Sequence, residues 1–275
     1  YKQVSYFSII SGLSMSDWSA LVHSYETFLV DLVGVVHDGI SAFPEAIQAL
    51  NQLPSHKTLI FASNNPRPSA LSLNKLRDYG LTRDFTVITS GDFARAQLQL
   101  DSQNTYYHWG AARNTDILAG IPLKLTENIQ AADKVLLTAF IEEQEDPHQF
   151  DPLIAQILQQ QLPVFCANPD IYAFHGQDLR KCAGYFANKL KEQGGELTLW
   201  GKPNLSFYNF IEQLVPPFKK ETCLMIGDTL ETDILGAQQF GIASLLVLTG
   251  VSEGKRQSQA LTLNQLTEKI KPTYI

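Results

Sequence analysis

One carboxylate, Asp31, follows an apolar run in the segment FLVDLVGVVHDG, and Gly34 lies three residues further on. Ligands of a parallel sheet bind at the carboxyl ends of its strands, so an aspartate there faces the crevice that would hold a substrate. The nearby glycine lets the backbone approach an anion closely. Asp31 is therefore placed as a nucleophile would be, although an aspartate after a strand is also a common turn or cap residue.

A second set of polar residues, Ser63, Asn64 and Asn65, follows the apolar run in the segment IFASNNPRP. One hydroxyl and two amides can donate hydrogen bonds to phosphoryl oxygens without adding charge, which would hold such a group in line for attack. Ser, Asn and Pro are also the usual turn residues, so this segment by itself is equally compatible with an ordinary turn.

A single lysine, Lys202, lies between a glycine and a proline in the segment LWGKPN. A lysine held by a tight turn can balance the charge of a carboxylate and of a phosphate. An isolated lysine is more commonly a solvated surface group. Lys202 is therefore a candidate only in combination with the other polar groups.

Two further carboxylates follow the apolar stretch of LMIGDTLETDILGA, Asp228 directly after it and Asp233 five residues later. Together with Asp31 they form an oxygen-rich set of the kind that Mg²⁺ prefers. Asp233, or Thr232 beside it, is an equally good candidate to cap the helix that follows. Asp228 is the stronger candidate ligand.

The elements that must position these residues alternate between strand-like and helix-like patterns. Runs rich in Val, Ile, Leu and Phe are each followed by a turn and an amphipathic stretch, which predicts βαβ units on a parallel sheet. The clearest strands are Thr27–Val36, Lys57–Ser63, Thr222–Ile226 and Ala243–Leu248, and the clearest helices are Pro44–Leu53, Ser69–Tyr79 and Thr232–Phe240.

A second alternating set lies in the middle of the chain. Its predicted strands are Thr105–Trp109, Lys134–Phe140 and Pro163–Cys166, and Pro152–Gln161 is a predicted helix. Because the two flanking parts each carry pieces of one sheet, we interpret the middle as an insertion. The predicted fold class is α/β, with a core of residues 1–82 and 171–275 and a second, inserted α/β domain of residues 83–170.

Composition excludes several classes of partner. Of the 275 residues 44% are hydrophobic and 18% charged, and the formal net charge is −7, as in a globular protein with an ordinary core. No run of Lys and Arg is interleaved with aromatic residues, so we expect no nucleic-acid partner. The apolar stretches are shorter than the roughly 20 residues that a membrane-spanning helix needs, so we expect no membrane partner.

The N-terminal segment YKQVSYFSII shows no signal-peptide pattern, which predicts a cytoplasmic location. The chain has three cysteines, an odd number without paired spacing. Buried free thiols are the expected state of Cys166, Cys182 and Cys223.

The order of the polar groups along the chain is more informative than any one of them. The chain has an Asp at the end of one strand, Ser-Asn at the end of the next, then a Lys, and then Gly-Asp followed by a second Asp. This order resembles the four motifs of the haloacid dehalogenase superfamily. The segments DLVGVVHDG, SNNPRPSA, CANPD, GKPN and GDTLETDILGA resemble its class IIA, NagD-like members, which carry a large α/β cap between the second and third motifs. The resemblance runs from about Phe28 to Gly250.

The resemblance implies a Rossmann-like parallel-sheet core, an inserted α/β cap domain, magnesium, and hydrolysis of a small phosphorylated metabolite through an aspartyl-phosphate. Related proteins with this cap often dimerise, so a homodimer is a further candidate partner. The implied catalytic residues are Asp31, Ser63 and Lys202. The implied substrate-binding residues are Gly34, Ser63, Asn64, Asn65 and Lys202, and Mg²⁺ would be held by Asp31, Asp228, Asp233 and the backbone carbonyl of Val33.

The match departs from the family at Val33. Phosphatases of this superfamily have a second Asp there, which protonates the leaving oxygen and then activates water, and losing such help typically removes about 10² to 10⁴ in rate. Three readings stay open. The substrate has a good leaving group, such as an acyl phosphate; His37 or Asp38 supplies the proton; or the chain is a catalytically impaired protein that binds a phosphorylated ligand in a regulatory or binding role.

The segment Asn168–Asp170 is a candidate hinge or specificity surface, because substrate choice in such enzymes depends on cap residues that face the crevice. Its proline is equally consistent with the simple end of a strand.

Overall fold

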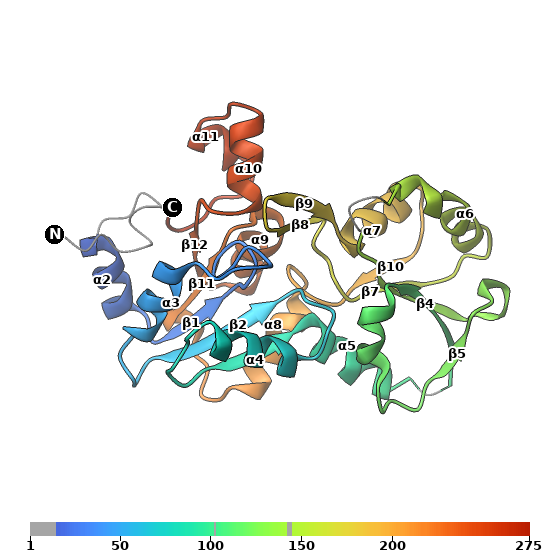
Figure 1. Ribbon diagram of the computed structural model, residues 1–275, viewed down its shortest axis with the longest axis horizontal. Coiled ribbons are helices and arrows are strands. Elements are labelled where there is room, and N and C mark those ends of the chain that lie inside the picture. The colour runs from blue at the N-terminus through green and yellow to red at the C-terminus, as the bar shows by residue number, and fades with distance from the viewer. Residues whose placement is uncertain (1–14, 102, 142–144) are drawn as a thin grey trace.

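Two parallel five-stranded sheets, each with its own helices, lie side by side in the computed structural model of the chain (Figure 1), which describes residues 15–101, 103–141 and 145–275. The N-terminal segment from which a cytoplasmic location was predicted lies outside these residues. No helix among the described residues is long and apolar enough to span a membrane.

The first sheet has the strand order β12-β11-β1-β2-β3, and all its strand pairs are parallel. Its central strand, β1, has later strands on both sides, so the strand order reverses there and a crevice opens at its carboxyl end. The strands are β1 (Thr27–Val30), β2 (Thr58–Ser63), β3 (Thr86–Thr89), β11 (Cys223–Gly227) and β12 (Ala243–Leu246).

The second sheet has the order β10-β7-β6-β4-β5 and is also parallel throughout. An antiparallel hairpin, β8 (Tyr172–His175) with β9 (Asp178–Lys181), follows β7 and projects back toward the first sheet (Figure 1). The strands of the second sheet are β4 (Thr105–Gly110), β5 (Lys124–Thr126), β6 (Lys134–Thr138), β7 (Val164–Cys166) and β10 (Leu197–Leu199).

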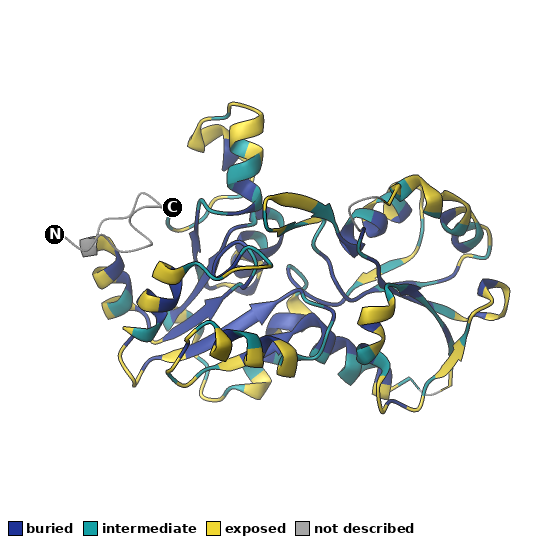
Figure 2. Cartoon of the chain, in the orientation of Figure 1, coloured by how far each residue is buried: buried dark blue, intermediate teal, exposed yellow. Residues whose placement is uncertain are grey.

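Helices connect the strands, and Figure 2 shows that their outward faces are exposed while the strands of the first sheet are mostly buried. Burial on both faces explains why the strands are nearly continuous apolar runs. The helices around the first sheet are α2 (Met15–Ser24), α3 (Pro44–Asn51), α4 (Ser69–Asp78), α8 (Leu205–Leu214), the π-helical turn η5 (Leu230–Ile234), α9 (Leu235–Phe240), α10 (Val251–Ser258) and α11 (Leu263–Leu266). Those beside the second sheet are α5 (Ser90–Gln99), α6 (Asp151–Gln159) and α7 (Ala183–Glu192), with short turns η1 (Ala112–Leu118), η2 (Ile129–Ala131) and η3 (Pro147–Phe150); η4 (Lys220–Thr222) precedes β11.

The pairing of two short strands differs from the predicted boundaries between the core and the insertion. β3 lies in the range predicted for the insertion, yet Ile60 of β2 pairs with Thr86 of β3 in the first sheet. β10 lies in the range predicted for the core, yet Leu197 pairs with Val164 of β7 in the second sheet. Both strands are short, and the sheet that a short strand joins depends on a partner distant in sequence.

The first predicted strand is shorter than the apolar run Thr27–Val36 suggested. β1 ends at Val30, and the chain then folds into a compact turn in which the backbone N–H of Gly34 donates to the carbonyl of His37 (2.8 Å). Gly34 has φ +88°, a left-handed conformation that residues with a Cβ adopt only under strain. The remaining apolar residues, Val35 and Val36, are buried in the core beneath this turn.

A shared apolar cluster fixes the second sheet against the first. Tyr106 and Leu136 from the second sheet belong to the same buried cluster as Ile60 of the first sheet and Phe207 of α8. The three cysteines are free and buried, as predicted. The two sheets therefore share one core, and the polar residues at their facing edges are held at defined distances.

Candidate active site

Three carboxylates converge at the carboxyl end of β1. One oxygen from each of Asp31, Asp228 and Asp233 lies within 4.8 Å of the others. Asp31 directly follows β1, Asp228 directly follows the neighbouring strand β11, and Asp233 lies in η5. The sequence analysis predicted this grouping from carboxylates that are about 200 residues apart in the chain.

Glycines make room for the two later carboxylates. A Cβ on Gly34 would lie 2.6 Å from the carboxyl carbon of Asp228, and a Cβ on Gly227 would lie 2.2 Å from the Cβ of Asp233. Asp228 is further fixed by the backbone N–H of Val251, which donates to its Oδ2 (2.6 Å). The predicted Gly34 therefore permits the turn after β1 to pack directly on Asp228.

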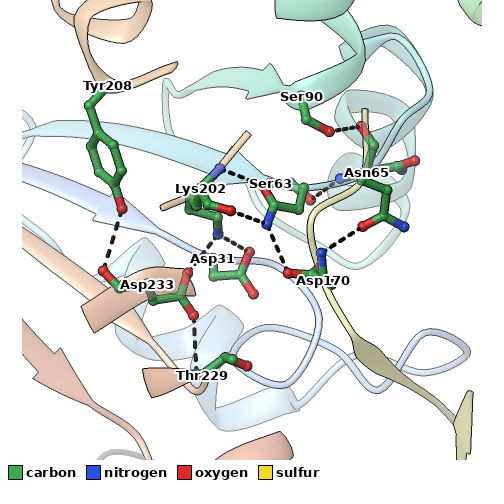
Figure 3. Close-up of polar contacts among 11 residues, drawn as sticks. Asp31, Ser63, Asn65, Ser90, Asp170, Lys202, Tyr208, Thr229 and Asp233 are labelled. Atoms are coloured by element: carbon green, nitrogen blue, oxygen red, sulfur yellow. Dashed lines mark hydrogen bonds and ion pairs between the residues drawn. The ribbon is translucent and has the colours of Figure 1, made fainter. Parts of the chain in front are cut away.

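Lys202 is the cation of this group. Its Nζ lies 2.6 Å from Oδ1 of Asp31 and 2.7 Å from Oδ1 of Asp233 (Figure 3), and its side chain is 1% exposed. The expectation that an isolated lysine is solvated therefore does not apply here. Asp233 also accepts from the backbone N–H of Thr229 through Oδ2 (3.2 Å), so it both stabilises its local turn and pairs with the lysine.

Burial and mutual repulsion disfavour three ionised carboxylates around one ammonium. Burial raises the pKa of Asp31 while Lys202 lowers it. Burial, opposed by Lys202, also raises the pKa of Asp233 to about 6. The pKa of Asp228 rises well above its ordinary value, chiefly through burial and then through Asp233 and Asp31. The group as built has more negative charge than one lysine neutralises, which is the condition that a divalent cation relieves.

The donor set fits such a cation. All three candidate ligands offer hard carboxylate oxygens, the type that Mg²⁺ prefers. The predicted backbone ligand, the carbonyl of Val33, accepts no hydrogen bond from the described residues, because its neighbours Leu32 and His37 take the hydrogen bonds of this turn. The Val33 side chain itself carries no polar atom and is partly exposed.

The polar residues after β2 divide into two kinds. The Ser63 hydroxyl oxygen accepts from the backbone N–H of Asn65 (3.2 Å), which leaves its proton available to a ligand. Asn65 Oδ1 accepts from the backbone N–H of Arg67 (3.0 Å) and its Nδ2 donates weakly to Ser72 (3.5 Å). Ser63 and Asn65 both line the cleft described below.

Asn64 is used inside the protein. Its Oδ1 accepts from the backbone N–H of Lys202 (2.8 Å), and its Nδ2 donates to the carbonyl of Lys202 (3.0 Å) and to Oδ1 of Asp170 (2.8 Å). Both amide protons are thereby engaged, so the side chain has no donor left for a phosphoryl oxygen. This corrects the predicted direct contact of the Asn64 side chain with substrate: it fixes the backbone at Lys202 instead.

Asp170 is a site residue whose role sequence reasoning missed. It was noted only as part of a candidate hinge, yet it lies partly buried beside Asn64 and Lys202 (Figure 3). Burial raises its pKa to about 6, and the Lys202 ammonium and the Asn64 amide act in the opposite direction. Its partner Asn64 lies 106 residues away, so no local pattern signals the contact.

Neither predicted substitute for the missing acid is suited to proton transfer. Burial, followed by the nearby charge of Lys75, lowers the pKa of His37 to about 3, and its Nδ1 accepts from the backbone N–H of Gly39 (2.9 Å). His37 is therefore neutral near pH 7. Burial raises the pKa of Asp38, but donation from the backbone of Ser41 and Ile40 outweighs it and keeps the carboxyl ionised.

A cleft of about 270 Å³ opens over these groups, between the two sheets. One wall comes from the turn after β1 and from α4, and the opposite wall comes from the second sheet and from the β8-β9 hairpin. The hairpin is held on the turn by a hydrogen bond from the backbone of Gly176 to the carbonyl of Asp38 (2.8 Å). Asp31, Val33, Ser63, Asn168, Asp170 and Phe174 are among the lining residues.

Two family models match the chain. Residues 28–124 match a haloacid dehalogenase-like hydrolase model, and residues 199–275 match a HAD-hydrolase-like model. The two matched ranges contain Asp31, Ser63, Lys202, Asp228 and Asp233.

Known proteins resemble the chain over most of its length. The human haloacid dehalogenase-like hydrolase domain-containing protein 2 is 26% identical over 237 residues, which cover 84% of this chain and 87% of that protein. A crystal structure of a haloacid dehalogenase-like hydrolase from Brucella suis 1330 is 31% identical, with a TM-score of 0.79 over 85% of this chain and 92% of that one. The glycerol phosphate phosphatase of Mycobacterium tuberculosis, in complex with magnesium, shares the fold at 24% identity, with a TM-score of 0.65 over 84% of this chain and 70% of that one.

Proposed function

The chain belongs to the haloacid dehalogenase-like hydrolases of class IIA, and from this premise we propose that it is a magnesium-dependent phosphatase of a small phosphorylated metabolite. The observation that carries the proposal is the convergence of Asp31, Asp228 and Asp233 on one point, with Lys202 against two of them, beneath a cleft. Such a set can hold a cation and an anion together, which hydrolysis of a phosphate ester requires.

We propose that Asp31, Asp228, Asp233 and the Val33 carbonyl hold the magnesium ion. The excess of buried negative charge and the hard oxygen donors support this assignment. When bound, magnesium supplies positive charge that favours the ionised carboxylates and reduces repulsion between Asp31 and the phosphoryl group. The magnesium complex of the M. tuberculosis phosphatase supports the same choice of cation.

In the proposed reaction an Asp31 oxygen attacks phosphorus. A bond forms between that oxygen and phosphorus, the bond from phosphorus to the leaving oxygen breaks, and water later releases phosphate from the aspartyl-phosphate. Lys202 holds Asp31 through Oδ1 and stabilises the charge that accumulates, while the Ser63 hydroxyl is free to donate to a phosphoryl oxygen. Asn65 and the backbone near Gly34 complete the proposed phosphoryl site.

The leaving oxygen receives no proton from position 33, because valine has none to give. His37 is neutral and its Nδ1 is engaged, and Asp38 is ionised, so neither supplies the proton. We therefore propose a substrate whose leaving group departs without strong protonation, such as an acyl phosphate.

Val33 also favours a second candidate function. A catalytically impaired member of the family would keep the carboxylates and Lys202 and bind a phosphorylated ligand in a regulatory or binding role. Asp31 lines the cleft, which favours the enzyme, since a binding protein has no need of a nucleophile there.

Phosphate release from a panel of phosphate esters and acyl phosphates, with magnesium, tests the proposal. Turnover by the wild type that Asp31→Asn abolishes is the expected result. Asp101→Asn is the matched control, because Asp101 also pairs with a lysine, Lys134 (2.5 Å), but does not line the cleft. Equal activity of the Asp31→Asn variant, or no turnover of any substrate, would reject the enzyme and leave the binding function.

We further propose that the second sheet acts as a cap over the site, since it supplies one wall of the cleft. The cytoplasmic location and the homodimer stay predictions from the sequence.

A further inference from the structure

A second cation lines the cleft outside the catalytic group. Lys75 belongs to α4, is partly buried, and donates from Nζ to the carbonyl of Gly39 (2.7 Å). Among the described residues no carboxylate lies within ion-pair distance of this ammonium. The carboxylate that does influence its pKa, Asp38, accepts hydrogen bonds from the backbone of Ile40 and Ser41 instead.

A partly buried ammonium with a single backbone acceptor is incompletely satisfied. Burial lowers the pKa of Lys75, which means that its surroundings disfavour the charged form. An ammonium has three protons to donate; among the described residues one carbonyl, that of Gly39, accepts from it, and the centroid of the Tyr79 ring lies 5.5 Å from Nζ. An anion in the cleft would accept a charge-assisted hydrogen bond and remove part of the cost of burial.

The position of Lys75 relative to the phosphoryl site follows from the helix. Ser72, which accepts weakly from Asn65 (3.5 Å), lies one turn before Lys75 on the same face of α4. Three residues of helix advance about 4.5 Å along the axis. Lys75 therefore lies about one helical turn beyond the loop that carries the proposed phosphoryl-binding residues, and both line the same cleft.

Charges of both signs line the cleft. Both lining carboxylates, Asp31 and Asp170, are engaged at the catalytic end by Lys202 and Asn64. The other lining cations are Arg67, paired with Asp116 (2.8 Å), and Arg113, which lies 4.5 Å from the ring centroid of Phe140. Lys75 differs from Arg67 in that no carboxylate of the described residues lies within ion-pair distance of it.

We propose that Lys75 binds a second anionic group of the substrate, a carboxylate or a second phosphate, so that the site selects compact metabolites with two negative groups. The small volume of the cleft, about 270 Å³, favours a short spacer between the groups. The inference rests on the proposed function, whose phosphoryl site sets the position of the first group.

A matched substrate pair tests the inference. 3-Phosphoglycerate has a carboxylate where glycerol 3-phosphate has a hydroxymethyl group, and the two compounds are otherwise the same. A bisphosphate of the same carbon length is the third substrate, and it distinguishes recognition of a phosphate from recognition of a carboxylate. The wild type should show a kcat/KM about 10- to 100-fold higher for one of the compounds with a second acidic group, and Lys75→Met should remove that preference. Activity on glycerol 3-phosphate should change by less than about twofold, and Lys75→Arg should keep part of the preference.

The control is a lysine in a similar bond but outside the cleft. Lys124 also donates to a backbone carbonyl, that of Gln103 (3.2 Å), and it is exposed on β5. Lys124→Met should leave the preference intact, and matching melting temperatures should establish that both variants fold. The inference is overturned if glycerol 3-phosphate is hydrolysed as well as the compounds with a second acidic group, or if Lys75→Met lowers activity on all substrates equally.

Calorimetric binding of the same compounds with magnesium separates this inference from the proposed hydrolysis. If these alkyl phosphates are not turned over, tighter binding of a compound with a second acidic group that is lost in Lys75→Met would still support the subsite, and the acyl phosphate assay alone would decide the hydrolytic function. Equal binding of the pair to wild type and variant would overturn the subsite, whatever the outcome of the phosphatase assay.

Discussion

The side-chain amide of Asn64 and the backbone of Lys202 are joined by reciprocal hydrogen bonds, from Lys202 N to Asn64 Oδ1 (2.8 Å) and from Asn64 Nδ2 to Lys202 O (3.0 Å). The two residues are 138 positions apart and follow different elements, β2 and β10. This pairing connects the two segments and holds the lysine whose ammonium contacts Asp31 and Asp233. The position of the Lys202 ammonium therefore depends on Asn64, whose own side chain has no free hydrogen-bond donor for a substrate.

Asn64→Ala should lower both stability and activity. The substitution leaves the buried N–H and carbonyl of Lys202 without partners, and we expect a loss of about 2 to 4 kcal/mol in the free energy of unfolding. Chemical denaturation and phosphate release would measure the two effects. Asn51→Ala is the control, because Asn51 also bridges two segments, donating to Gly80 O and accepting from Thr82 N (both 2.9 Å), but lies outside the cleft. If Asn51→Ala reduces the rate per folded molecule as strongly, the Asn64 interpretation fails.

Lys202→Met should nearly abolish turnover. Without the ammonium, Asp31 and Asp233 lose their shared partner, and removing one member of a buried charge group costs about 3 to 5 kcal/mol. We expect a rate loss of about 10² to 10³, measured per folded molecule. Lys57 provides the control, since it is equally buried and pairs with Glu26 (2.8 Å) remote from the cleft. Lys57→Met should lose stability but keep the rate; equal rates for both variants would exclude a catalytic role of Lys202.

Asp228→Asn should be more stable than the wild type near pH 7.5 in the absence of metal. The pKa of Asp228 is raised by folding, so below its folded pKa the native carboxyl keeps a proton that the unfolded chain has already lost. Native stability therefore falls as the pH rises above the unfolded value of about 4. The amide removes this cost, so the variant should melt at a higher temperature than the wild type at this pH.

Thermal melts at about pH 5 and about pH 7.5, with and without magnesium, check this prediction. The advantage of Asp228→Asn should shrink toward pH 5, and magnesium should stabilise the wild type more at the higher pH while leaving the variant unchanged. Asp101→Asn should behave oppositely, because pairing with Lys134 and other donors outweighs burial and lowers the pKa of Asp101 to about 2. A magnesium shift of equal size in Asp228→Asn would remove Asp228 from the ligand set.

Val33→Asp should accelerate hydrolysis of alkyl phosphates by about 10²-fold or more, because it restores a group able to protonate the leaving oxygen. Val33 lines the cleft and is partly exposed, so the carboxyl can be accommodated facing the substrate. Acyl phosphates, whose leaving groups need little protonation, should gain far less. Val33→Asn is the matched control with a similar shape and no acidic proton. A folded Val33→Asp protein with an unchanged rate on alkyl phosphates would show that the reaction does not lack leaving-group protonation.

Much of the fold was predictable because its information is local. Apolar runs and turn residues located β2, β11 and β12 to within a few residues and the start of β1, and the order of the polar segments after them indicated the family and the convergence of Asp31 with Asp228. The carboxyl ends of neighbouring parallel strands must meet at one edge, so the grouping of these carboxylates follows from topology alone.

The tertiary structure alone decided which sheet the short strands join and what the polar side chains contact. β3 and β10 are four and three residues long, and their sheets are chosen by partners distant in sequence. Likewise, the sequence suggests that Asn64 donates hydrogen bonds to phosphate, and only its contacts with Lys202 and Asp170 show that its amide is engaged within the protein. Lys75 looks like a surface lysine in the sequence, and only the structure shows that it lines the cleft. Periodicity encodes burial along one segment, whereas a hydrogen bond or an unmet charge depends on where distant segments are brought together.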